Sequence, residues 1–284
     1  MTAASGLPPA PPGLSVPVID SHAHLDLAAA HGLDPVAALD AAEAVNVVGV
    51  VQIGTDLISS RMGADLARSD PRARAAVALH PNEAPALAVR EGRAALTSAW
   101  AEIARLARQP EVSAIGETGL DYFRTPPEGR AVQEESFRVH IGIAREVGKP
   151  VIVHDRDAHA DVLRVLDEEQ AECVIIHCFS GDAAMARALA ERGWYASFAG
   201  NITFRSADDL RDALRIVPGN LLLVETDAPF LTPTPHRGRP NSPYLLGHTI
   251  TAMAEIRQDD VEALAEGTYR NAETVFGAWA GSGR

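Results

Sequence analysis

Six side chains of the kinds that bind metal ions stand at or just after the ends of short apolar runs. The first run, VPVID (16–20), leads into His22 and His24, and residues two apart in an extended chain share one face. Two imidazoles on one face pack poorly in a core but chelate a divalent ion well. The other four follow later runs: Glu117, His154, His177 and Asp227. Imidazole and carboxylate ligands of this kind are typical of metal-dependent hydrolysis.

Each of these groups also has an ordinary structural explanation. A single histidine at a strand end is more often a hydrogen-bonded core residue, and a single carboxylate there commonly caps the next helix. Six such groups at the ends of five runs favour a shared metal site over six separate structural roles, provided that the fold brings them together.

The elements that must position these residues are eight short β-branched runs that alternate with Ala-, Leu- and Arg-rich helical stretches. We expect strands at 16–20, 45–54, 73–79, 111–116, 150–154, 173–177, 194–200 and 220–227, and helices near 34–45, 58–69, 90–109, 131–147, 159–170, 183–192, 206–217, 244–257 and 260–277. Strict alternation predicts the α/β class, and eight units in about 250 residues predict a single (β/α)8 TIM-type barrel. An open doubly wound sheet is the alternative, but no Gly-rich phosphate loop follows the first strand.

A barrel gathers the carboxyl ends of its strands at one mouth, so the six groups converge there. Six ligands exceed the four that one tetrahedral ion takes. Two ions that share a carboxylate satisfy all six, with Glu117 as the expected bridge. Lys149 is the only lysine and precedes Pro150 at the start of a strand, at the wrong end of the barrel, which argues against a modified-lysine bridge.

The motifs around these residues resemble the TatD family of metal-dependent hydrolases, within the amidohydrolase-like barrels. The matching segments cover nearly the whole chain after residue 15, in order: VIDSHAHLD (18–26), ALHPNE (78–83), AIGETGLDYFR (114–124), PVIVHDRDAHAD (150–161), IIHCFSGD (175–182), FAGNITF (198–204), LLLVETDAPFLTP (221–233) and PHRGRPNSP (235–243). Two positions depart from the family pattern. Ser242 follows Asn241 where Glu is common, and Asp182 follows HCFSG where a small residue is common; both bear on substrate contacts.

The resemblance implies a (β/α)8 barrel with two divalent-metal sites. One site would be bound by His22, His24, Glu117 and Asp227, and the other by Glu117, His154 and His177. The expected catalytic residues are Asp227 and Glu117. Asp227 is either the base that takes a proton from the attacking water or a ligand only. Imidazole ligands favour Zn²⁺ or Mn²⁺ by softness, whereas the resemblance supports Mg²⁺ for a nuclease.

Side chains around the mouth are expected to bind substrate: Arg156, His80, Arg205 and His236. Arg156 is two residues after His154, and arginine suits phosphate recognition; a surface ion pair with Asp155 or Asp157 is the alternative. His80 either lines the mouth or caps a helix. Arg205 and His236 lie on loops after the seventh and eighth strands, where barrels commonly bind phosphate. Glu225, one layer deeper than Asp227, is expected to be a buried partner and not a ligand.

Composition limits the remaining possibilities. The 284 residues include 38 Asp and Glu against 25 Lys and Arg, a formal net charge of −13. That charge excludes broad binding of duplex nucleic acid, but it is compatible with strand ends that enter a mouth containing cations. No apolar run reaches the ~18 residues of a membrane helix. Cys173 and Cys178 would lie about 16 Å apart in a strand, so we expect free thiols and a cytoplasmic protein.

Residues 1–15 are rich in Pro, Ala, Gly and Ser and lack the pattern of a secretory signal. They are expected to form a disordered extension before a barrel over 16–284, and a monomer is the default.

Three functions fit these features. The first is a divalent-metal-dependent phosphodiesterase on nucleic-acid ends, a TatD-type deoxyribonuclease acting as a 3′–5′ exonuclease. The second is an ester or amide hydrolase, such as a D-aminoacyl-tRNA deacylase. The third, a non-catalytic metal-binding scaffold, is disfavoured because all six ligands and the candidate base are present.

Overall fold

The structure, a computed structural model, describes residues 6–279. Eight parallel strands form one sheet whose spatial order equals their order in the chain. The strands are β1 (Val18–Ala23), β2 (Val47–Ile53), β3 (Ala73–Val77), β4 (Val112–Asp121), β5 (Val151–Arg156), β6 (Val174–Ile176), β7 (Tyr195–Phe198) and β8 (Leu222–Val224). The sheet closes where Ala23 pairs with Ala228, just beyond β8. The predicted single (β/α)8 barrel is confirmed.

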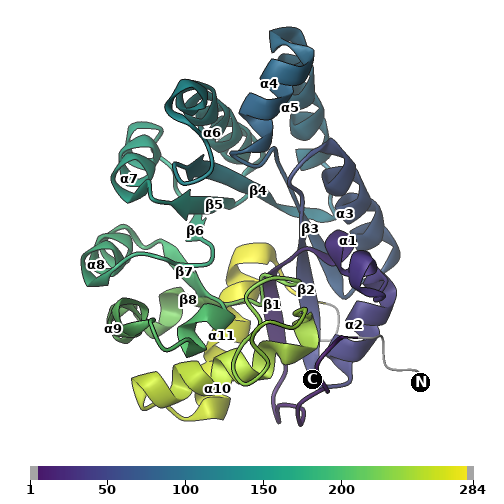
Figure 1. Ribbon diagram of the computed structural model, residues 1–284, viewed down its shortest axis with the longest axis vertical. Coiled ribbons are helices and arrows are strands. Elements are labelled where there is room, and N and C mark those ends of the chain that lie inside the picture. The colour runs from purple at the N-terminus through teal and green to yellow at the C-terminus, as the bar shows by residue number, and fades with distance from the viewer. Residues whose placement is uncertain (1–5, 280–284) are drawn as a thin grey trace.

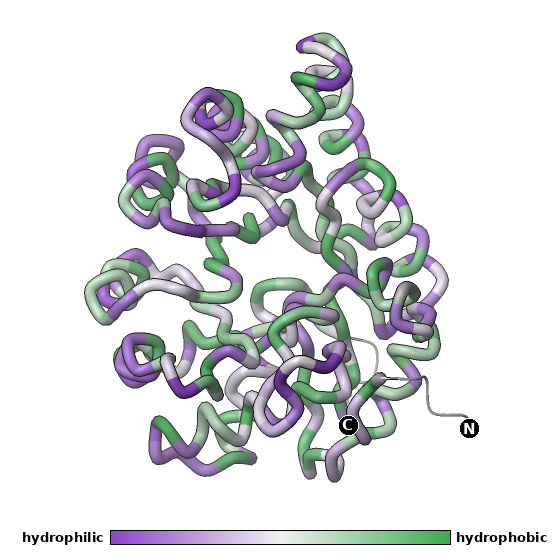
Figure 2. Tube along the Cα trace, viewed as in Figure 1, coloured by the Kyte–Doolittle hydropathy of each residue, from purple (hydrophilic) through white to green (hydrophobic). Residues whose placement is uncertain are grey.

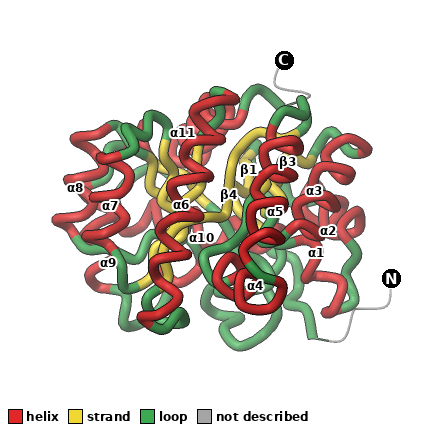
Figure 3. Tube along the Cα trace, turned by 90° about the horizontal axis from the view of Figure 1, so that it is seen from above, coloured by secondary structure: helices red, strands yellow, loops and turns green. Residues whose placement is uncertain are grey.

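Helices follow every strand and surround the sheet (Figures 1 and 3). They are α1 (Leu25–Ala28), α2 (Pro35–Glu43), α3 (Leu57–Ser69), α4 (Glu83–Glu91), α5 (Arg93–Ala107), α6 (Pro127–Val147), α7 (His159–Glu168), α8 (Ala183–Arg192), α9 (Asp208–Ile216), α10 (Leu246–Arg257) and α11 (Val261–Phe276). Hydrophobic and hydrophilic residues alternate along these helices (Figure 2), as expected when one face packs on the sheet and the other meets water. Side chains of Asp34, Asp56, Asp182 and Asp260 cap four of the helices.

Two hydrophobic clusters form the core. The larger lies between the strands and the helices around them. The smaller fills the barrel interior with alternate strand residues, among them Ile19, Ile53 and Ile152, and continues to Phe276 and Trp279 after α11. The indole of Trp279 donates to the carbonyl oxygen of Arg72, just before β3, so this packing closes the amino end of the barrel. The polar groups are therefore left at the carboxyl end.

Some element boundaries differ from the sequence-based expectation. The helix expected over 90–109 is divided by Gly92, whose φ of +87° belongs to the left-handed half of backbone space. β8 ends at Val224, short of the expected residue 227, because the next residues turn to pair with β1. β4 runs five residues past the expected end at 116 and reaches Asp121. The changes in β8 and β4 occur at the carboxyl end of the barrel, where the polar groups lie.

The segment before β1 differs from the expected disordered extension in the part that the structure describes. The Tyr244 hydroxyl donates to the Pro8 carbonyl oxygen over 2.6 Å, and the amide of Leu14 donates to the carbonyl oxygen of Val45 over 3.2 Å. Arg239 also donates to the carbonyl oxygen of Gly6. Composition could not show these bonds, because the acceptors are backbone carbonyls. Residues 1–5, which the same prediction included, lie outside the described residues.

Two further expectations concern the described residues. Cys173 and Cys178 are both free, as predicted. Within residues 6–279, no helix is both long enough and apolar enough to span a membrane.

Candidate metal centre

The first group of metal-binding atoms lies where β1 meets the segment after β8. The Nε2 atoms of His22 and His24 are 3.3 Å apart. Oδ1 of Asp227 lies 3.7 Å from the first and 3.5 Å from the second. Oε2 of Glu117 lies 3.5 and 3.7 Å from the same two nitrogens. A tetrahedral ion with bonds of about 2.0–2.1 Å holds its ligand atoms about 3.3 Å apart, so the distances from each carboxylate oxygen to the two nitrogens are close to those that one ion requires.

The second group surrounds the other oxygen of the same carboxylate. Oε1 of Glu117 lies 2.7 Å from Nδ1 of His154, 3.0 Å from Nε2 of His177 and 3.4 Å from Nε2 of His80. Nδ1 of His154 and Nε2 of His177 are 3.4 Å apart. Glu117 therefore presents one oxygen to each group, and the donor set fits two ions that share this carboxylate.

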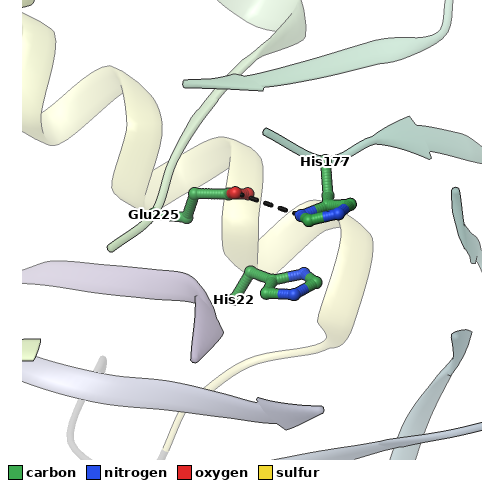
Figure 4. Close-up of side chains that lie close together, drawn as sticks. All are labelled: His22, His177 and Glu225. Carbon is green, nitrogen blue, oxygen red and sulfur yellow. Dashed lines mark hydrogen bonds and ion pairs between the residues drawn. The ribbon is translucent and has the colours of Figure 1, made fainter. Parts of the chain in front are cut away.

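Two of the histidines have an acidic side chain beside the ring nitrogen that faces away from the centre. Nδ1 of His177 donates to Oε1 of Glu225 over 3.2 Å, and the backbone amide of Cys178 donates to the same oxygen over 2.9 Å. Figure 4 shows Glu225 beside His177, and the ring of His22 stacks on that of His177 at a centroid distance of 3.9 Å. This contact leaves Nε2 of His177 to face Glu117. Glu225 is thus fully buried, as expected, and hydrogen-bonded to His177; His22, His177 and Glu225 also lie close enough together to hold an ion.

His154 also has an acidic neighbour, although no hydrogen bond joins the two side chains. Its Nε2 lies 3.5 Å from Oδ2 of Asp121, a fully buried carboxylate. The side-chain amide of Asn82 donates to that oxygen, and the backbone amide of Arg124 donates to Oδ1. The second imidazole is thereby oriented with Nδ1 towards Glu117.

Local backbone geometry brings these groups into place. Asp227 has φ of +53°, a left-handed conformation that Asp tolerates better than most residues. Its amide donates to the carbonyl oxygen of His22 over 2.9 Å, so β1 and the end of β8 are held together beside the first group. On the other side, Gly119 lies against β5, where a Cβ atom would meet the carbonyl oxygen of His154 at 2.1 Å. Only glycine permits this approach.

The electrostatics keep both carboxylates ionised. Burial by itself raises the pKa of the Glu117 carboxyl, but the charges of His177 and His80 and the hydrogen bonds around it bring this pKa well below its usual range. Burial is likewise outweighed at Asp227, where a hydrogen bond from His24 and nearby imidazole charges lower the pKa. Two ionised carboxylates among imidazoles are a strong site for a divalent cation.

A model of the TatD-related DNase family matches residues 19–277. The chain belongs to this family. It is 45% identical over 266 residues to the "Uncharacterized metal-dependent hydrolase TatD" of Mycobacterium tuberculosis, with 92% of this chain and 98% of that protein covered. It is 37% identical over 244 residues to the "3′-5′ ssDNA/RNA exonuclease TatD" of Escherichia fergusonii, with 82% and 89% covered.

The fold of this TatD-family chain is similar to that of YJJV, a TatD homologue of Escherichia coli K12. The TM-score is 0.83 at 26% identity, and 92% of this chain and 98% of that one are covered. The resemblance inferred from the motifs is confirmed. Family and donor set together make the chain a metal-dependent hydrolase.

The structure brings all six predicted metal-binding residues of the TatD pattern to the mouth, whereas the predicted substrate residues are divided. His80 lies inside the centre, at Oε1 of Glu117. Arg156 is exposed over the ring of Phe123 at 4.2 Å and makes no ion pair with either neighbouring aspartate. Arg205 is exposed between β7 and α9. The ring of His236 lies edge-on to that of His248 at 5.4 Å and, among the described residues, makes no hydrogen bond or ion pair with the centre.

Sequence reasoning missed several supporting residues. Asp20 accepts hydrogen bonds from the amide and hydroxyl of Thr226, which ties β1 to the residues after β8, and burial raises the pKa of Asp20 to about 7. Gln52 accepts from the amide of Leu25. The available signal was a polar residue at the end of an apolar run for Asp20 and inside one for Gln52. Asp182, one of the two departures from the family pattern, caps α8.

Lys149 lies at the amino end, as expected. Its Nζ donates to the carbonyl oxygens of Ala107 and Gln109 over 2.6 and 2.9 Å. It is therefore occupied far from the metal-binding atoms, and the carboxylate of Glu117 takes the central position.

Proposed function

We propose that this TatD-family hydrolase is a divalent-metal-dependent phosphodiesterase that removes nucleotides from the 3′ end of single-stranded DNA. The observation that carries the proposal is the placement of Glu117, with Oε2 beside His22 and His24 and Oε1 beside His154 and His177. Two divalent ions sharing a carboxylate would lower the pKa of a water and stabilise the attacking and leaving oxygens during displacement at the phosphorus of a phosphodiester.

Different residues of the chain would hold the metal ions, accept a proton and contact the substrate. Glu117 is only 4% exposed and is surrounded by imidazoles, so it holds the two donor groups together. The Asp227 side chain is 13% exposed and lies nearer the open mouth. Because its pKa is lowered, Asp227 is an ionised carboxylate that can accept a proton from an attacking water. We assign substrate contacts to His80, Arg156, Arg205 and His236.

Two further observations support strand ends as the substrate. A relative 37% identical to this chain is named as a 3′–5′ exonuclease of single-stranded DNA and RNA. The net charge of −13 disfavours binding along a duplex, because such binding depends on many phosphate contacts over a broad basic surface. A short single strand that enters the mouth needs positive charge only there.

The test is an assay of the purified protein on 5′-end-labelled single-stranded DNA with added Mg²⁺, Mn²⁺ or Zn²⁺. Stepwise shortening from the 3′ end is expected. An Asp227→Asn variant, in which the amide cannot accept the proton, should lose at least 100-fold of the rate, on the order of a general-base contribution. Asp259→Asn, on the surface after α10, is the matched control.

A D-aminoacyl-tRNA is assayed in parallel. Release of the amino acid without any shortening of DNA would overturn the phosphodiesterase and support the ester hydrolase instead. Metal analysis of the protein as purified would establish which ions it holds and how many; a single ion per chain would contradict the shared-carboxylate centre.

A further inference from the structure

Four arginines of the described residues have side chains that make neither an ion pair nor a hydrogen bond: Arg124, Arg156, Arg205 and Arg237. All four are exposed at the carboxyl end of the barrel, where Arg156 ends β5 and the other three follow β4, β7 and β8. The described arginines on the outer helices make an ion pair or a hydrogen bond to a carbonyl oxygen, and Arg138 pairs with three glutamates. In a chain of net charge −13, unpaired cations gathered around one mouth indicate an anionic ligand there.

Two phenylalanines at the same mouth are also exposed. Phe123, after β4, is 63% exposed, and Phe230, after β8, is 51% exposed. The ring of Phe230 lies 6.0 Å from that of His24, a metal-binding residue. β4 and β8 are four strands apart in a barrel of eight, so Phe123 and Phe230 follow strands on opposite sides of the barrel. The exposure of an apolar ring surface to water is unfavourable in free energy, and a ligand that stacks on the ring would remove that surface from water.

Arginine and phenylalanine are combined at this mouth. The guanidinium of Arg156 lies over the ring of Phe123 at 4.2 Å, and that of Arg237 lies over the ring of Phe204 at 4.3 Å. A guanidinium held on a ring is oriented without a carboxylate, so its charge stays available to a phosphate. Flat rings next to free guanidinium groups match a ligand that alternates planar bases with phosphates.

We propose that these six residues, Arg124, Arg156, Arg205, Arg237, Phe123 and Phe230, form a mouth collar that binds single-stranded nucleic acid. Unpaired bases on the two sides of the scissile phosphate stack on Phe123 and Phe230, and neighbouring phosphates meet the arginines. The inference rests on the proposed phosphodiesterase function and adds the reason for strand selectivity: bases within a duplex are stacked on each other and cannot reach the two rings.

The stacking is tested by binding, in an Asp227→Asn background with Mn²⁺ so that no strand is consumed. Fluorescence anisotropy gives the Kd for a labelled strand of about ten thymidines and for the same sugar–phosphate strand with abasic positions at its 3′ end. Phe230→Leu and Phe123→Leu keep apolar bulk but lose the aromatic face. Each is expected to weaken thymidine-strand binding roughly tenfold and to leave abasic-strand binding unchanged. Ile58→Ala, at a 78% exposed site on α3, is the control.

The arginine contacts are tested by salt dependence. Each phosphate contact on a single strand contributes about 0.7 to the slope of log K against log salt concentration. Arg156→Ala and Arg205→Ala should each lower that slope by about this amount. Arg187→Ala, whose guanidinium bonds only to a carbonyl of its own helix α8, should not change it.

The outcomes separate the two proposals. If the phenylalanine variants weaken both strands equally or neither, and the arginine variants leave the slope unchanged, the mouth collar is refuted even when the wild-type protein shortens DNA. If the collar variants behave as expected but the wild-type protein hydrolyses no strand, the proposed phosphodiesterase activity is refuted and the proposed binding surface is supported.

Discussion

Glu225 provides a sharp test of how the centre is organised. Its carboxylate is fully buried, and Oε1 accepts hydrogen bonds from Nδ1 of His177 and from the backbone amide of Cys178. Glu225→Gln keeps the shape and an acceptor oxygen but removes the negative charge. If Glu225 orients His177 and strengthens it as a ligand, the substitution should weaken metal binding without removing a ligand.

The size of the effect follows from the geometry. Two unit charges 3.2 Å apart, the distance from Oε1 of Glu225 to Nδ1 of His177, interact by about 5 kcal/mol at an effective dielectric constant of about 20. The imidazole N–H carries only part of a unit charge, and glutamine retains the hydrogen bond. We therefore expect about 1.4–2.7 kcal/mol, which is a 10- to 100-fold weaker affinity for the ion at His177.

The assay is competition between the protein and a chromophoric chelator for Zn²⁺ or Mn²⁺, with thermal unfolding in chelator as the check on folding. The matched control is Glu273→Gln on α11, which replaces a carboxylate that accepts hydrogen bonds from Tyr269 and Trp279 away from the mouth. A folded Glu225→Gln protein with the metal affinity of Glu273→Gln would show that the charge behind His177 has no part in metal binding.

Two other predictions concern the packing beneath the centre. Burial lowers the pKa of His140 from 6.5 to about 4, and its Nε2 accepts from the amide of Leu79, so this histidine is neutral in the fold. The contribution of neutral His140 to the free energy of unfolding is complete above pH 6.5 and falls as the pH drops towards 4. Over this range the histidine of the unfolded chain binds a proton while the buried histidine of the folded chain does not, so protonation favours unfolding. Urea unfolding should show about 2 kcal/mol lost at this site between pH 7 and pH 5, and a His140→Gln protein with an unchanged pH slope would contradict this. Gly119→Ala should cost more than about 1 kcal/mol of stability and weaken metal binding, whereas Gly142→Ala, with open space around it in α6, should be neutral or stabilising; equal melting temperatures would count against the close approach to His154.

Much of the centre could be predicted from local sequence because the relevant rules are local. The face shared by His22 and His24 follows from strand periodicity, and the convergence of Glu117, His154 and His177 follows from the parallel barrel topology. Asp227 could be identified from the sequence as a candidate ligand, but the backbone conformation that places its carboxylate could not. The strand ends at Val224, and a left-handed turn with a hydrogen bond to the carbonyl oxygen of His22 places the carboxylate.

Other features depend on contacts between segments far apart in the chain. His80 is in the centre because the register of β3 and β4 brings it beside Glu117, and nothing in ALHPNE distinguishes that position from a helix cap. The segment from residue 6 to β1 is held by side chains such as Tyr244, more than 200 positions away. Residue type alone cannot predict which backbone carbonyl a distant side chain will meet.

The amino-acid sequence by itself determined the barrel, the family and the chemical character of the mouth, because the strand–helix alternation and strand-end residues are properties of short segments. Only the tertiary structure decided how these residues are used. It directed the two oxygens of one carboxylate to different imidazole pairs, placed Glu225 and Asp121 beside two of the histidines, and left four arginines at the mouth without an ion pair or a side-chain hydrogen bond among the described residues. These outcomes depend on distances between atoms on different strands, and those distances exist only once the sheet has closed.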